Sequence, residues 1–132
     1  DALDCIVAAE IIEHLADPSA FLRGLIAILK PGGILIVTTP YKEKIQYSLC
    51  IHCNQLTPHN AHLHSFNEAS MRQLLPEGVE AGVYIFNSKL LSKLRILRLF
   101  SGIPIALWKW IDRIGIAVSG KKALRLMLTV RK

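Results

Sequence analysis

Runs of apolar residues define the first 40 positions of the chain. Residues 4–9, DCIVAA, are apolar without alternation, which is typical of a strand buried on both faces of a parallel sheet. Residues 21–29 repeat apolar side chains at intervals of three and four, which predicts a helix with one apolar stripe. A second apolar run, ILIVTT at residues 34–39, predicts another buried strand. Together these segments predict a crossover unit with two parallel strands.

The ends of these elements carry their usual residues. Asp17 and Pro18 predict the start of the helix, because the carboxylate can accept an N–H of the first turn and proline needs no donor there. The LKPGG segment predicts its end, with Gly32 or Gly33 in a left-handed C-cap. Pro40 stops the second strand.

A second helix is predicted within SFNEASMRQLL. Asn67 is the expected N-cap, because its side chain can accept the free N–H groups of the first turn. Two kinds of support fit the spacing: a hydrophobic staple of Phe66 with Met71, and a capping box of Ser65 with Glu68.

The remainder of the chain predicts two strands around a helical segment. Residues 79–86, VEAGVYIF, predict a strand. Residues 90–118 are very apolar and predict helix with a break at residues 101–104. Residues 123–130, ALRLMLTV, place leucines at every second position and predict a final strand.

Composition changes this picture little. The chain has 132 residues, of which 52% are hydrophobic and 20% charged, so we expect one globular domain and not a disordered chain. No stretch reaches the ~20 uninterrupted apolar residues of a spanning helix. The first residues carry acids where a secretory signal carries base, so we expect an intracellular, cytoplasmic protein.

Charge is distributed unevenly along the chain. Residues 1–80 contain five Lys and Arg against nine Asp and Glu, whereas residues 81–132 contain eleven against one. The basic final third suits an acidic partner such as a phosphate, a nucleic acid or an anionic membrane surface. The simpler interpretation is a solvated basic surface.

Several short motifs follow one another in order over residues 1–75. EHL follows the first strand, DP starts the helix, LKPGG precedes the second strand and TP follows it; Phe66 and Asn67 then begin the next helix. In this order the motifs resemble the second half of class I S-adenosylmethionine-dependent methyltransferases of type 11/12.

The resemblance implies a fold, a cofactor and a reaction. It implies the C-terminal half of a Rossmann-like, doubly wound α/β sheet, with a helical insertion near the C-terminus and Asp4 opening the family's fourth strand. It also implies that S-adenosylmethionine lies at the carboxyl edge of the sheet, with the backbone of Ala9 and Glu10 beside its methionine end. The reaction it implies is direct methyl transfer to a nucleophile.

One part of the family's pattern is missing. None of the eight glycines belongs to a G-x-G motif, so we expect the chain alone to bind S-adenosylmethionine weakly. We interpret the chain as the acceptor side of the fold without most of the cofactor side. The first strand would then be an open edge that pairs with a missing N-terminal half or with a second copy.

His14 stands at the mouth of the predicted unit. At this position an imidazole can orient or deprotonate a methyl acceptor, so we predict His14 as the catalytic residue. The alternative is a structural imidazole bonded to backbone. Glu10 and Glu13 are the nearby acids, and both can equally serve to complement a helix N-terminus.

Residues 41–64 predict a loop or small insertion rich in His and Cys. It contains a C-x-x-C pair followed by three histidines: Cys50, Cys53, His59, His62 and His64. Two thiolates and two imidazoles form a tetrahedral set that suits Zn²⁺, so we predict a structural zinc site at Cys50, Cys53, His59 and His62. The alternative is a loop with unligated thiols and exposed histidines.

Residues 88–120 predict an apolar and basic helical insertion. The charged residues of its second half are three and four positions apart and predict one narrow polar face: Lys109, Asp112 and Arg113. The same pattern predicts burial of Trp108, Trp110 and Ile111. The insertion could cap an acceptor pocket for apolar or lipid substrates, dock on an anionic membrane, or pack on the sheet or a second copy.

The leading hypothesis from sequence is a fragment of a methyltransferase for small-molecule or lipid-like acceptors. A zinc-containing nucleic-acid-binding module is disfavoured, because neither interleaved aromatic and basic residues nor a recognition helix accompanies the Cys/His segment. A third hypothesis is a non-catalytic partner that completes another methyltransferase by edge pairing, and homo-oligomerisation is expected on the same grounds.

Overall fold

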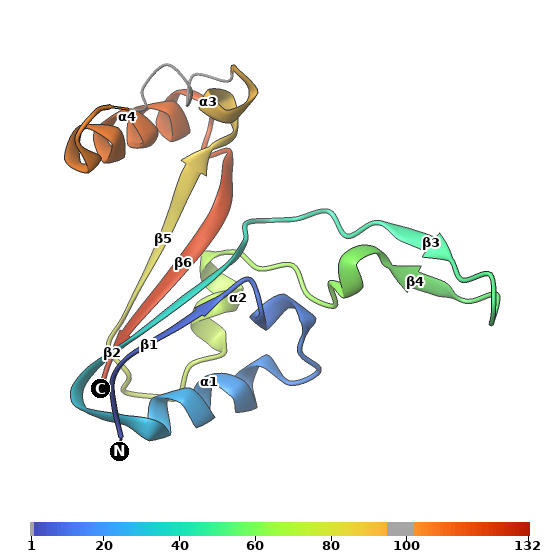
Figure 1. Cartoon of the computed structure of the whole chain (residues 1–132), viewed down its shortest axis with the longest axis horizontal. Coiled ribbons are helices and arrows are strands. Elements are labelled where there is room, and N and C mark those ends of the chain that lie inside the picture. Colours follow the sequence, from blue (N-terminus) through green and yellow to red (C-terminus); the bar gives the residue numbers. More distant parts are fainter. Residues whose placement is uncertain (1, 95–101) are drawn as a thin grey trace.

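Four strands form one mixed sheet in the computed structural model, which describes residues 2–94 and 102–132 (Figure 1). Their order is β1-β2-β6-β5, with bounds β1 Leu3–Ala9, β2 Leu29–Pro40, β5 Ala81–Ser88 and β6 Ala123–Arg131. β1 and β2 are parallel, and β6 runs antiparallel to both of its neighbours. The carboxyl ends of β1, β2 and β5 therefore lie at the same edge of the sheet.

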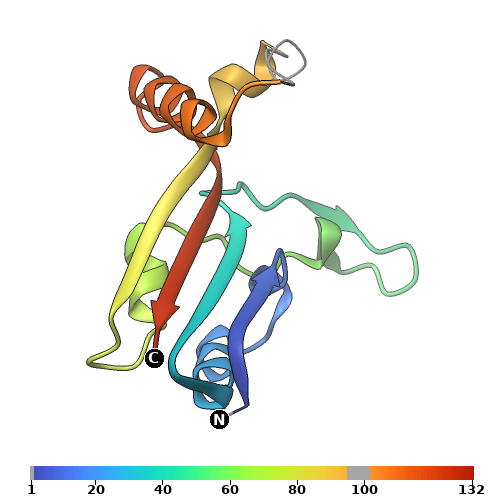
Figure 2. The same cartoon turned by 60° about the vertical axis from the view of Figure 1, so that its left-hand side comes forward.

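The predicted crossover unit is confirmed. Helix α1 (Pro18–Ile28) connects β1 to β2, and the Asp17 carboxylate accepts the N–H of Ala20 at 2.8 Å. Helix α1 and helix α2 (Glu68–Gln73) cover the same face of the sheet (Figure 2). The core between these helices and the sheet includes the fully buried Leu22, Leu35 and Met71.

The prediction that the first strand is buried on both faces is wrong. Among the described residues β1 is an edge strand, and the helices cover one face of the sheet only. The opposite face therefore exposes large apolar side chains, including Val7 at 63% and also Tyr84 and Phe86. The open edge expected from sequence is present along β1.

The predicted glycine cap of α1 is also wrong. The helix ends at Ile28, Leu29 already has extended backbone angles, and LKPGG forms the first part of β2. Gly32 has φ +79° and donates its N–H to the carbonyl of Lys132 at 2.7 Å. At Gly33 a Cβ would lie 2.9 Å from the carbonyl oxygen of Lys30. The extended conformation of residues 29–33 is therefore set by pairing with strands that are distant in sequence.

Two glycine substitutions should have opposite effects on stability. Gly33→Ala is expected to lower the free energy of unfolding by about 1–3 kcal/mol, because its Cβ would press on backbone atoms that cannot move cheaply. Gly24→Ala should raise it by about 0.5–1 kcal/mol, because Gly24 lies inside α1 with open space around it. Urea unfolding measures both changes, and equal signs would contradict the contact at Gly33.

Helix α2 is capped as predicted, with one difference in the capping box. The Asn67 side chain accepts the N–H groups of Ala69 and Ser70, and the Ser70 hydroxyl accepts the N–H of Asn67. Ser70 thus takes the place that the sequence assigned to Ser65 and Glu68. Phe66 and Met71, the predicted staple pair, are both buried.

Residues 41–64 contain a β-hairpin that projects away from the main sheet (Figure 1). It consists of β3 (Tyr47–Leu49) and β4 (Leu56–Pro58), followed by the 3₁₀ turn η2 (His59–Ala61). The sequence predicted this insertion without its strands. A bridge between Tyr41 and Phe66 closes the base of the insertion.

The predicted helical segment between β5 and β6 contains α3 (Lys89–Lys93) and α4 (Ile105–Val118). Pro104 caps α4, which confirms the second half of the predicted break. The predicted helix over residues 95–101, including the break at Ser101, lies outside the described residues.

The predicted faces of α4 are wrong at Asp112 and Trp110, and Trp108 and Ile111, also predicted to be buried, are only half-buried. Asp112 is 6% exposed, and its carboxylate accepts the N–H groups of Asn87 and Ser88 at 2.8 and 2.6 Å. Trp110 is 62% exposed. The helix turns its carboxylate inward because the junction between β5 and α3 presents backbone donors that need an acceptor. Its outward face is then apolar, with exposed Leu107, Trp110, Ile114 and Val118.

None of the helices in the described ranges has the length and hydropathy needed to span a bilayer.

Candidate active site

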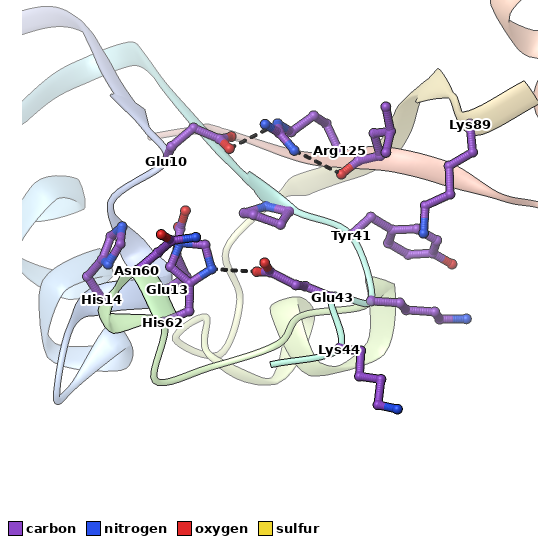
Figure 3. A pocket seen from close by; sticks show the side chains of 13 residues that line it. Glu10, Glu13, His14, Tyr41, Glu43, Lys44, Asn60, His62, Lys89 and Arg125 are labelled. Carbon is purple, nitrogen blue, oxygen red and sulfur yellow. Dashed lines mark hydrogen bonds and ion pairs between the residues drawn. The ribbon is translucent and has the colours of Figure 1, made fainter. Parts of the chain in front are cut away.

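A polar pocket of about 520 Å³ lies at the carboxyl edge of β1 and β2 (Figure 3). Segments far apart in the sequence line it: the ends of β1 and β2, the return of the hairpin, the start of α3 and the start of β6. This is the edge where open α/β sheets bind their ligands. The lining contains four cations and three carboxylates: Lys42, Lys44, Lys89, Arg125, Glu10, Glu13 and Glu43.

Glu10 is held in place on both sides. Its φ of 53° is left-handed, which is uncommon for a residue with a side chain and is found mostly where function or a turn requires it. The carboxylate accepts the Thr38 hydroxyl at 3.1 Å and pairs with Arg125 at 2.9 Å. The predicted cofactor position Glu10 therefore lines the pocket, whereas Ala9 pairs with Thr38 in the sheet and is not among the lining residues.

Glu13 is a buried carboxylate at the bottom of this site. It is 1% exposed and accepts the Thr39 hydroxyl at 3.0 Å. Its backbone carbonyl accepts the N–H groups of Leu63 and His64. These bonds fix the return of the hairpin against the turn after β1 and thereby place His62 in the pocket.

Two imidazoles, His14 and His62, stand beside Glu13 with ring centroids 4.7 Å apart. His14 Nδ1 lies 3.2 Å from the carbonyl of Ala61, which can only accept, so Nδ1 donates and Nε2 of the neutral ring is free to accept a proton. His62 Nδ1 lies 2.5 Å from a carboxylate oxygen of Glu43. The carboxylate accepts from Nδ1 and so orients His62 with Nε2 as the basic nitrogen.

In the structure His62 lies beside Glu13 and His14, and not beside the cysteines of the predicted zinc site. Ligating atoms of Glu13, His14 and His62 lie within 4.8 Å of one another and could hold a divalent cation. Within residues 2–94 and 102–132, this is the only group of three or more His, Cys, Asp or Glu side chains close enough to share a metal ion. Neither Cys50 nor Cys53 belongs to it. The four predicted zinc ligands are therefore not brought together.

The cysteines lie at the tip of the hairpin, in the turn between β3 and β4. The N–H groups of Cys53 and His52 point at the Cys50 sulfur and, together with the Cys53 thiol, lower the pKa of the Cys50 thiol. His59 lies at the other end of β4, and its N–H bonds to Gln46. His64 donates from Nε2 to the Leu15 carbonyl at 2.8 Å and stacks on Phe66.

A tyrosine and a lysine form the outer wall of the pocket. The Tyr41 hydroxyl donates to the carboxylate of Glu68 at 2.9 Å, and the Lys42 ammonium lies 5.1 Å from the Tyr41 ring centroid. Tyr41, followed by Glu68, raises the pKa of Lys42. A cation therefore lies at the entrance, where it can attract an acidic group of a ligand.

Sequence reasoning missed Arg125, Glu43 and Lys89 as site residues. Arg125 had a usable signal, because it is a charged residue in an otherwise apolar strand, and its register partner Pro40 marks the carboxyl edge. Glu43 and Lys89 had none, since each lies in a polar or basic segment and reaches the pocket only through the path of the chain.

This fold and this site together define a class of protein. A parallel pair with a polar pocket beyond its carboxyl ends, extended by an antiparallel strand, is a Rossmann-like α/β arrangement. A family profile described as a methyltransferase domain matches residues 1–78. The chain belongs to this methyltransferase-domain family.

Individual relatives match shorter segments. The human mitochondrial ubiquinone biosynthesis O-methyltransferase is 41% identical over 51 residues, which are 39% of this chain and 14% of that protein. The match to the first curated relatives thus spans a seventh to a fifth of their length.

Solved structures share the fold at low identity. The phosphoethanolamine N-methyltransferase 2 of Haemonchus contortus, in complex with S-adenosyl-L-methionine, aligns over 98% of this chain and 33% of its own, with TM-score 0.54 and 14% identity. The [4+2]-cyclase SpnF aligns over 99% of this chain and 50% of its own, with TM-score 0.55 and 19% identity. The chain therefore has the Rossmann-like fold of the methyltransferase class.

Proposed function

We propose that this chain forms the acceptor side of an S-adenosylmethionine-dependent methyltransferase that acts on an oxygen of a small-molecule or lipid-like acceptor. The observation that carries the proposal is the His62 and Glu43 pair, which presents a basic nitrogen to a pocket at the carboxyl edge of the sheet. An oxygen acceptor is supported by the similarity to ubiquinone biosynthesis O-methyltransferases. Hydroxyl groups of such acceptors become better nucleophiles when a base takes their proton.

In the proposed reaction the residues of this chain hold and deprotonate the acceptor. His62, oriented by Glu43, takes the hydroxyl proton, and the neighbouring His14, our sequence-based choice, is the second candidate for that role. Lys42 and Lys89 at the pocket lining attract the oxyanion. S-adenosylmethionine supplies the electrophilic methyl group when it is bound, and Glu10 with the exposed end of β1 at Ala9 is the proposed contact for its methionine end.

A coloured phenol tests the acceptor half without a methyl donor. We expect 4-nitrophenol, added at mildly acidic pH, to bind the chain and to show the absorbance of its phenolate, because the site supplies a base and nearby cations. Binding without phenolate absorbance would contradict the proposed proton transfer. Calorimetric titration with S-adenosylmethionine complements this test: we expect weak binding, and micromolar affinity of the monomeric chain would show that the cofactor site is contained in these 132 residues.

A second candidate function is a non-catalytic partner of another methyltransferase. It is favoured by the open edge of β1 and by the exposed apolar residues on the uncovered face of the sheet. The alignment with a cyclase also shows that this fold carries more than one reaction. Failure to bind 4-nitrophenol, together with pairing along β1, would favour the partner function.

Three further proposals concern docking on a membrane, the cellular location and zinc binding. The exposed apolar face of α4, which includes Trp110 and is flanked by Lys109 and Arg113, suits an anionic membrane surface. Sedimentation with phosphatidylglycerol vesicles tests this, with neutral vesicles as the control.

A cytoplasmic location is a further proposal. Because some relatives are named as mitochondrial proteins, cell fractionation is the test of this location. Zinc is proposed as a structural metal, held by Cys50 and Cys53, and is tested by elemental analysis.

A further inference from the structure

The turn at the hairpin tip is shaped to present two sulfurs to one metal ion. Cys50 and Cys53 lie in the same tight turn between β3 and β4, where the nearby backbone N–H groups of Cys53 and His52 lower the pKa of the Cys50 thiol. The turn closes through Cys50 N–H to Gln55 O and Asn54 N–H to Cys50 O, both 2.9 Å. Asn54 has φ 55°, a left-handed conformation that asparagine tolerates well. Backbone hydrogen bonds therefore hold both cysteines in one short turn before any metal binds.

The turn supplies only half of a zinc site. Structural zinc takes four ligands, usually Cys and His in a tetrahedron. In the described part of the chain no third Cys, His, Asp or Glu joins the two thiols within 4.8 Å. His62 and His64 are engaged elsewhere, His62 with Glu43 and His64 with the Leu15 carbonyl. The described arrangement thus supplies two of the four ligands, and two more are needed.

The hairpin offers a surface on which a second copy can sit. It projects from the sheet (Figure 1), and Ile51 at its tip is 99% exposed. Tyr47, Leu49 and Leu56 on its strands are exposed as well. Residues 45–67 contain no Asp, Glu, Lys or Arg, although the whole chain carries a net charge of +6. Two copies that repel each other elsewhere can therefore approach at the hairpin without charge repulsion.

We propose that Cys50 and Cys53 form a zinc half-site that is completed by the same two cysteines of a second copy of this chain. A twofold axis through the metal gives four thiolates in a tetrahedron and a closed, isologous dimer. The exposed apolar residues of the two hairpins pack against each other beside the metal. Each thiol releases its proton when it ligates zinc, so assembly weakens as the pH falls. The inference rests on the proposed zinc binding, and it identifies a second copy of the chain as the source of the other two ligands.

Metal content and mass together test the second copy. The full chain is kept under a phosphine reductant, so that disulfides do not form, and is loaded with Zn²⁺ alone. We expect half a zinc per chain and a dimer in sedimentation, with both lost in Cys50→Ser and Cys53→Ser and on chelation. Cys5→Ser is the matched control and should retain both, because Cys5 is an exposed thiol on β1, outside the hairpin.

Cobalt and a histidine variant separate the sources of the missing ligands. Co²⁺ in place of zinc should show the intense thiolate absorption of four sulfurs, and His59→Gln should leave it unchanged. One zinc per monomer, together with a cobalt absorption typical of two thiolates that is lost in His59→Gln, would mean that the missing ligands come from the same chain. That result would overturn the proposed second copy but not the proposed zinc binding. Absence of zinc, with all three thiols freely titratable, would overturn both.

Discussion

Replacing His62 with glutamine should slow the proposed methyl transfer by roughly 10²–10⁴-fold, the usual contribution of a positioned general base. Glutamine keeps the approximate size of the side chain and its bond to Glu43 but cannot accept the acceptor's proton. Release of S-adenosylhomocysteine with catechol as the probe acceptor measures the rate. The phenolate absorbance of bound 4-nitrophenol reports the same loss without a methyl donor. Glu43→Gln should reduce both signals less, since the imidazole remains and only its orienting carboxylate is gone.

The histidine prediction has two internal controls. His14→Gln shows which imidazole is the base: a larger loss in His14→Gln than in His62→Gln would assign the proton transfer to His14. His52→Gln should leave the rate unchanged, because His52 is exposed at the hairpin tip and does not line the pocket. A His62→Gln protein with full activity and phenolate absorbance would contradict the proposed role of the pair.

Removing the Asp112 carboxylate should destabilise the fold by about 2–4 kcal/mol. Asp112→Ala leaves the N–H groups of Asn87 and Ser88 without an acceptor, and each unsatisfied buried donor costs about 1–3 kcal/mol. The Ser88 hydroxyl next to them is buried without a hydrogen-bond partner within the described residues, so the variant would add to a polar group that is already unsatisfied. Urea unfolding followed by tryptophan fluorescence measures the loss, since Trp108 and Trp110 lie on the same helix.

A conservative variant and a surface variant serve as controls for the loss of stability in Asp112→Ala. Asp112→Asn retains one acceptor oxygen and should lose about half as much stability as Asp112→Ala. Ile114→Ala removes an exposed apolar side chain from the same helix and should change the free energy of unfolding by no more than about 0.5 kcal/mol. Equal stability of Asp112→Ala and the unmodified chain would mean that water or another group satisfies these donors.

The helix and strand assignments came mainly from local pattern. Asp17 and Asn67 cap the helices that the sequence predicted, and β2, β5 and β6 lie where apolar runs and period-two alternation placed them. Such signals act over a few residues, because capping and side-chain periodicity depend on the immediate backbone. For the same reason they could not decide whether LKPGG ends a helix or begins a strand, since the partner of Gly32 is the far terminus of the chain.

Much of the candidate site depended on long-range contacts. His62 was predicted as a zinc ligand from its spacing to the cysteines, yet bonds from Leu63 and His64 to the Glu13 carbonyl hold this segment at the pocket instead. Arg125 reaches Glu10 across more than a hundred positions of sequence. Residue type and spacing predicted His14 and Glu10 at the carboxyl edge, but they carried no information on which distant segment would fold over that edge.

The sequence by itself determined the parallel β1 and β2 unit, the helix caps and the edge at which the polar residues gather, because these follow from short-range periodicity and capping chemistry. Only the tertiary structure decided which face of α4 is buried and that His62 joins His14 beside Glu13. Both outcomes depend on backbone donors and acceptors that belong to other elements: the free N–H groups after β5 draw Asp112 inward, and the Glu13 carbonyl holds the hairpin return. A buried polar group takes the partner that the fold brings to it, and that partner is not encoded in the spacing of its own segment.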